Sequence, residues 1–198
     1  MDQVSRRALL ARAGIGTGAG VVALLGGGAV PAFAAAGEAD LANARLICAG
    51  KRLMINWYTR WLNTPKALGR VAATRELLLD IRAQEQAGYG LLAPLLGTTA
   101  PTDDDFTYTF PAGALRSPAA AVRFGLDLEH LMLGIGIGAA ATTADTAVAA
   151  SIASIVGSDG MHHSALSALA RGQIVPDALP TGIGVDDASV QLSQFLSN

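Results

Sequence analysis

The stretch Gly97–Arg116, GTTAPTDDDFTYTFPAGALR, decides which fold this chain can adopt. Long helical patterns lie on both sides of it. Only Phe106–Phe110 within it reads as extended, and we do not expect that part to form a sheet. About 20 extended residues reach at most about 66–72 Å, whereas a helix of about 22 residues is about 33 Å long. The stretch is therefore long enough to cross the full length of a helical bundle.

Two helices are predicted before this connection. Along Glu38–Asn63, polar and apolar residues fall on opposite faces at 100° per residue, which is typical of an amphipathic helix. Thr64-Pro65 then reads as the N-cap and first residue of a second helix. This helix is expected to run to about Leu96, because Gly97 stands where a C-terminal glycine belongs.

Two more helices are predicted after the connection. Ser117-Pro118 repeats the start signal for a third helix, which is expected to run to about Ala141. A fourth helix, ending at about Arg171, has three candidate caps at its start: Thr142, Thr143 and Asp145. The remaining tail, 173–198, contains prolines and turn residues, so we expect it to be irregular and packed on the bundle.

The connection lengths predict the topology. Tight turns join the first two helices and the last two, so each pair is an antiparallel hairpin. Two hairpins joined by one long crossover make an all-α, ferritin-like four-helix bundle, which we assign to residues 37–172. The nearly uncharged stretch Leu131–Gly157 could be mistaken for a membrane span, but its polar residues mark a turn between two helices.

Residues 1–36 have the three parts of a signal peptide. Ser5–Leu10 matches the twin-arginine pattern, the glycine-rich apolar run Gly14–Val30 follows, and Pro31–Ala34 ends in small residues. We expect cleavage after Ala34, with cleavage after Ala36 or a retained membrane anchor as alternatives. The predicted location is periplasmic, cell-wall or extracellular.

The composition excludes several classes of function. Without Met1–Ala34 the net charge is about −4, so the sequence has no electrostatic footprint for nucleic acid or an anionic membrane. Cys48 is the one cysteine, so no internal disulfide can form. We interpret it as a buried apolar residue.

Acidic and histidine residues recur at positions that could hold a metal. Di-iron bundles use one Glu from each of two helices and Glu-x-x-His from each of the other two. The fourth helix has Asp159-Gly160-Met161-His162, the third has a lone Glu129, and the second has Glu85 with Gly88 in place of the histidine. The first helix has Lys51 at its candidate ligand position. We expect the neighbouring His130 and His163 to be non-ligands, and Tyr58 to be a core residue or a support for the site.

The chain resembles the ferritin-like family that includes desiccation-related proteins, many of them exported. The matching segments cover nearly the whole mature chain: Lys51–Tyr58, Asp80–Gly97, Phe106–Phe110, Leu128–Ala141, Ser154–Leu166 and Arg171–Pro180. The resemblance implies a di-metal carboxylate site in intact members. Carried over by position, Glu85, Glu129, Asp159 and His162 keep ligand-type residues, whereas Lys51 and Gly88 do not.

Several hypotheses about the site and the function stay open. A buried Lys51 ammonium could pair with Glu85 or Glu129 and supply the charge that a metal would provide. Alternatively, Glu85, Glu129, Asp159 and His162 hold one metal ion, iron or another divalent cation, or the site is intact, or these residues never converge. The leading function is a non-catalytic or weakly metal-binding exported protein, related to stress by resemblance. The alternatives are a metal-dependent oxidase or ferroxidase, and a helix-bundle interaction module that pairs as a homodimer through helix faces. We expect no nucleic-acid partner and, after signal cleavage, no membrane partner.

Overall fold

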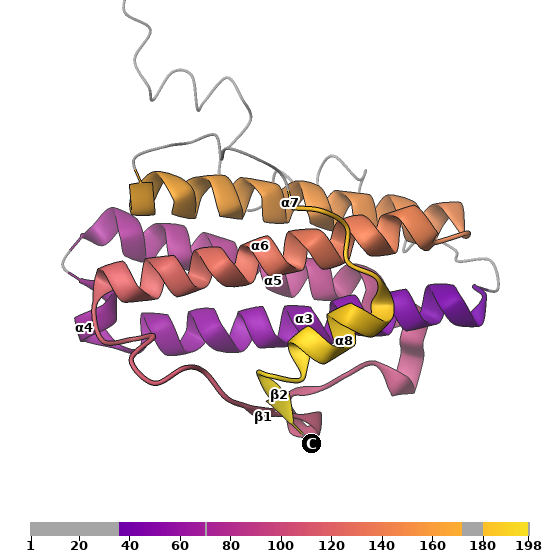
Figure 1. The fold of residues 1–198 in the computed structure, drawn as a ribbon, viewed down its shortest axis with the longest axis horizontal. Helices are drawn as coiled ribbons and strands as arrows, with labels where there is room; N and C mark the ends of the chain where they lie inside the picture. Colours follow the sequence, from indigo (N-terminus) through magenta and orange to yellow (C-terminus); the bar gives the residue numbers. More distant parts are fainter. Residues whose placement is uncertain (1–35, 70, 172–179, 198) are drawn as a thin grey trace, which may run out of the picture. The chain divides into compact units, whose positions relative to one another are not determined.

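Four long helices dominate the residues that the computed structural model describes, 36–69, 71–171 and 180–197. They are α3 (Glu38–Leu62), α5 (Ala72–Leu96), α6 (Pro118–Thr142) and α7 (Thr146–Arg171). These helices lie side by side (Figure 1), which confirms the predicted all-α bundle. The signal sequence predicted for 1–36 lies outside the described residues except for Ala36.

The four helices form two hairpins. The helix α3 packs along α5, and α6 packs along α7; the two pairs meet through α3–α6 and α5–α7 contacts. The connection from Leu96 to Pro118 contains the short 3₁₀ helices η1 (Gly97–Thr99) and η2 (Asp103–Asp105). It joins the two hairpins, as the length of this stretch predicted.

Side-chain caps start α6 and α7. The hydroxyl oxygen of Ser117 accepts a hydrogen bond from the Ala120 backbone N–H at 3.2 Å, and Pro118 follows at the first helical position. Asp145 accepts from the backbone N–H groups of Ala147 at 2.8 Å and Val148 at 3.0 Å. Both caps satisfy N–H groups that a helix leaves unpaired at its start.

The predicted single helix from Pro65 to Leu96 is wrong. The structure has a one-turn helix, α4 (Pro65–Leu68), and α5 begins only at Ala72. Gly69 separates them with φ at 74°, a backbone conformation that favours glycine. The Thr64 hydroxyl donates to the Arg60 carbonyl at 2.8 Å and does not cap α4.

The prediction of an irregular tail is wrong for part of the described segment, and so is the expectation of no sheet. The tail forms the helix α8 (Val185–Leu192) and then the strand β2 (Leu196–Ser197). Strand β2 pairs antiparallel with β1 (Thr107–Tyr108) in the crossover, with Thr107 opposite Ser197. A pair of two-residue strands so far apart in sequence leaves no local pattern. The first part of the predicted tail, 173–179, lies outside the described residues.

The glycines of α6 make room for the tail and for α7. A Cβ atom on Gly138 would lie 2.0 Å from the Ile183 carbonyl oxygen, and one on Gly134 would lie 2.8 Å from the Ile183 side chain. The Ile183 backbone N–H also donates to the Gly134 carbonyl at 2.9 Å. Gly136 allows α7 to approach α6, since a Cβ there would lie 2.6 Å from Val156 of α7.

Helix α6 is long and apolar enough to cross a membrane by length and composition. Of the described helices it is the one that meets this test, and 56% of its most apolar window is buried inside the bundle. A helix in the core of a bundle has the same length and apolar composition.

Candidate metal centre

The interior of the bundle collects one ionisable cluster from all four long helices. Lys51 lies on α3, Glu85 on α5, Glu129 on α6, and Asp159 with His162 on α7. Each of these side chains is at most 3% exposed. One ligand-type atom from each of the last four lies within 4.8 Å of the others. The structure therefore brings together every residue that the sequence proposed for the site.

Lys51 lies among these acids. Its Nζ atom is 2.5 Å from Asp159 Oδ1 and 2.9 Å from Glu85 Oε2. The aliphatic part of the side chain passes over Gly88, where an added Cβ atom would lie 3.4 Å from Lys51 Cε and 3.6 Å from Ile155 Cγ1. A histidine at position 88 would therefore compete with Lys51 for the same space.

Glu129 is bound by a tyrosine on the neighbouring helix. The Tyr58 hydroxyl donates a hydrogen bond to Glu129 Oε1. Burial, together with this carboxylate, raises the pKa of Tyr58 well above its usual range. The bond agrees with both roles considered for Tyr58, a core tyrosine with a hydroxyl partner and a support for the site.

His162 has an acceptor at each ring nitrogen. Its Nδ1 lies 3.1 Å from Glu85 Oε1 and 3.5 Å from Glu129 Oε1. Its Nε2 lies 2.9 Å from the side-chain oxygen of Gln84, which also accepts from the Ser158 hydroxyl at 2.9 Å. Two acceptors favour the doubly protonated imidazolium. Burial alone would lower the pKa of His162, but the carboxylates of Glu129 and Glu85 outweigh it and raise the pKa to about 10.

Gln84 and Ser158 are site residues that the sequence did not reveal. Gln84 directly precedes Glu85, and Ser158 lies one helical turn before His162. This spacing was the available signal, but uncharged polar residues at such positions are common on helix surfaces.

The charges of the cluster nearly balance. Burial alone would lower the pKa of Lys51, but Asp159, Glu85 and Glu129 outweigh it and raise the pKa. Burial would raise the pKa of Glu85, yet Lys51 and His162 lower it overall. The pKa of Asp159 rises to about 7 through burial, despite the nearby Lys51. With a proton on Asp159, two cations face two carboxylates and the buried cluster is neutral.

The donor set by itself suits a divalent cation, but Lys51 does not. Three carboxylates and one imidazole are ordinary ligands for zinc, manganese or iron. Glu129 Oε2 and Asp159 Oδ2 have no hydrogen-bond partner among the described residues. However, the Lys51 ammonium lies against two of the four ligands, has no lone pair to donate and repels a cation. The residues present therefore do not fit a two-metal centre.

The other candidates lie outside the cluster. His163 is buried and its ring lies 5.6 Å from that of the exposed His130, centroid to centroid; neither belongs to the metal-type group. Cys48 is buried, and burial raises the pKa of its thiol to about 12.

Comparison with known protein families supports the ferritin-like fold of the bundle. A family model described as a ferritin-like domain matches residues 34–172, which include all four long helices and the whole cluster. A search of curated protein sequences finds no match.

Proposed function

Because the chain belongs to the ferritin-like domain family, we propose that it is an exported, non-catalytic member in which the Lys51 ammonium takes the place of a metal ion. The observation that carries this proposal is the position of Lys51 Nζ, 2.5 Å from Asp159 and 2.9 Å from Glu85. Together with His162, the ammonium supplies positive charge to these buried carboxylates.

A metal analysis tests the proposal. The wild-type protein, expressed with added iron, zinc or manganese, is expected to retain less than one ion per chain. Lys51→Ala removes the ammonium and leaves Glu85, Glu129, Asp159 and His162 in place. We expect this variant to bind a divalent cation, measured as an ion-dependent rise in melting temperature and by elemental analysis.

Lys66→Ala is the matched control, because Lys66 is exposed on α4. It should bind as little metal as the wild type. A stoichiometric ion in the wild-type protein would overturn the proposal.

Export and a role in stress form the finer part of the proposal. Its support is the twin-arginine pattern at Ser5–Leu10 and the resemblance to desiccation-related proteins; Ser5–Leu10 lies outside the described residues. Cell fractionation with N-terminal sequencing should find a mature chain outside the cytoplasm that begins at Ala35 or Gly37. Replacing both Arg6 and Arg7 by Lys should leave the uncleaved precursor inside the cell.

A metal-dependent oxidase is the second candidate. The specific observation in its favour is the pair of carboxylate oxygens, Glu129 Oε2 and Asp159 Oδ2, that lack hydrogen-bond partners among the described residues. Oxygen consumption on addition of ferrous iron, lost in Glu129→Gln, would support it over the non-catalytic proposal. A homodimer through helix faces is a separate proposal, which sedimentation equilibrium tests directly.

A further inference from the structure

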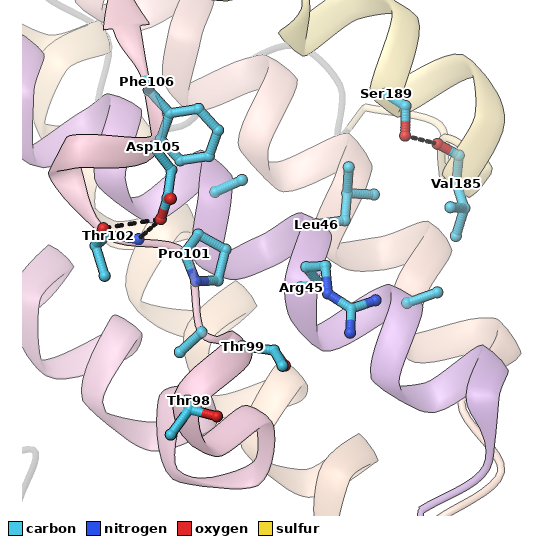
Figure 2. A pocket seen from close by; sticks show the side chains of 13 residues that line it. Arg45, Leu46, Thr98, Thr99, Pro101, Thr102, Asp105, Phe106, Val185 and Ser189 are labelled. Atoms are coloured by element: carbon cyan, nitrogen blue, oxygen red, sulfur yellow. Dashed lines mark hydrogen bonds between the residues drawn. The ribbon is translucent and has the colours of Figure 1, made fainter. Parts of the chain in front are cut away.

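A groove on the surface of the bundle lies outside the ionisable cluster. The groove, with a volume of about 610 Å³, lies between α3, the start of the crossover and α8 (Figure 2). Ala42, Leu46 and Ala49 line the groove from one face of α3. Pro101 and Phe106 line it from the crossover. This volume is within the range of about 300–1,000 Å³ that small-molecule sites usually have.

Arg45 is the cation of this groove. Figure 2 shows it beside Leu46 and among the other lining residues. Its side chain is exposed, and its guanidinium forms no ion pair or hydrogen bond with any residue that the structure describes. The guanidinium is thus available to an incoming anion.

The acid that lines the groove is already engaged. Asp105 accepts from both the backbone N–H and the hydroxyl of Thr102, at 2.7 and 2.8 Å. These hydrogen bonds lower the pKa of Asp105 and hold its carboxylate toward Thr102. The Ser189 hydroxyl also has a partner, since it donates to the Val185 carbonyl at 2.8 Å. Arg45 is therefore the charged group with unused hydrogen-bonding capacity on these walls.

We propose that this groove binds a small amphipathic carboxylate. The carboxylate pairs with the Arg45 guanidinium, whose planar fork of donors matches two oxygens. The apolar body of the ligand lies over Leu46, Pro101 and Phe106, so that burial of its surface adds to the charged contact. A cation of the same shape is repelled by Arg45, and a neutral molecule gains the apolar contact alone.

Octanoate is a suitable probe, with octyltrimethylammonium as the cationic counterpart. Calorimetric titration of the full chain should show saturable binding of one octanoate and none of the cation. Arg45→Gln should weaken octanoate binding about tenfold, the effect of losing one charge-assisted contact. Arg75→Gln is the matched control, because Arg75 is an exposed arginine on α5 outside the groove, and it should leave binding unchanged.

A second variant tests the location without touching the charge. Ser189→Trp places a large ring on the α8 wall and should reduce octanoate binding while Arg45 is intact. Non-saturable binding, equal binding of the cation, or full affinity in either groove variant would overturn the proposal. Far-ultraviolet circular dichroism of each variant checks that the helices remain folded.

Discussion

At the scale of single residues, Lys51 and Gly88 depend on each other. The Lys51 side chain crosses the space that a larger residue at position 88 would fill, with Cε 3.4 Å from the position of a Cβ atom on Gly88. The same side chain places its ammonium between Asp159 and Glu85. A change at either position should therefore change the effect of a change at the other.

A double-mutant cycle tests this coupling. We expect Gly88→His alone to destabilise the fold by about 1–3 kcal/mol, because the ring and the Lys51 side chain overfill the core. Adding Lys51→Ala should recover part of that loss, since it vacates the space. Urea unfolding of the two single variants and the double variant measures the coupling. Strictly additive free energies would show that the two residues are independent.

At the scale of elements, the tail segment 181–184 packs tightly against Gly134 and Gly138 of α6. The segment lies so close that a Cβ atom on Gly138 would meet the Ile183 backbone. Directly after it, α8 packs on α3 and buries Ala188 and Leu192. The position of α8, and with it one wall of the groove, depends on this contact.

Two glycine-to-alanine changes separate packing from helix propensity. Gly138→Ala should destabilise the protein and increase hydrogen exchange in α8, because its Cβ atom would lie 2.0 Å from Ile183 O. Gly157→Ala, in α7, meets nothing within 4 Å and should stabilise by about 0.5–1 kcal/mol through helix propensity. Equal effects of the two changes on unfolding in urea would argue against a tight contact between tail and helix.

At the scale of the whole molecule, the buried cluster sets how stability responds to pH. The pKa of Asp159 rises from 3.8 to about 7 on folding, and that of His162 rises from 6.5 to about 10. A group with a raised pKa stabilises the fold below its unfolded pKa and loses that contribution as pH rises through its folded pKa. The pKa of Glu85 falls below 4.5, so its contribution is lost in acid instead.

Stability should therefore decline from mildly acidic to alkaline pH. We expect the free energy of unfolding to fall between pH 6.5 and about 10 as His162 loses its proton, and the contribution of Asp159 to fade by about pH 7. His162→Gln should flatten the slope above pH 6.5. Thermal melts of the wild type and of His162→Gln from pH 5 to 10 measure the two slopes. His130→Gln is the control because His130 is exposed. A profile that is unchanged in His162→Gln would contradict the assignment of this slope to His162.

Local signals in the sequence were enough for the long helices and their order. Caps such as Ser117 and Asp145, and the apolar face of Glu38–Asn63, act within a few residues and are visible in the sequence. The length of the crossover added the bundle topology. The break at Gly69 was missed because a single glycine inside a helical pattern was read as tolerated after the Thr64-Pro65 start signal.

The sequence by itself determined four helices and two hairpins, because helix periodicity and connection length are properties of neighbouring residues. It named the ionisable residues that could form a site but left open whether they converge. Only the tertiary structure decided which side chains of separate helices contact one another. Three contacts join residues far apart in the chain: the ion pairs of Lys51, the contact between His162 and Gln84, and the packing of the tail against Gly138. Such contacts depend on distances of a few ångströms between separate helices, which no local pattern encodes.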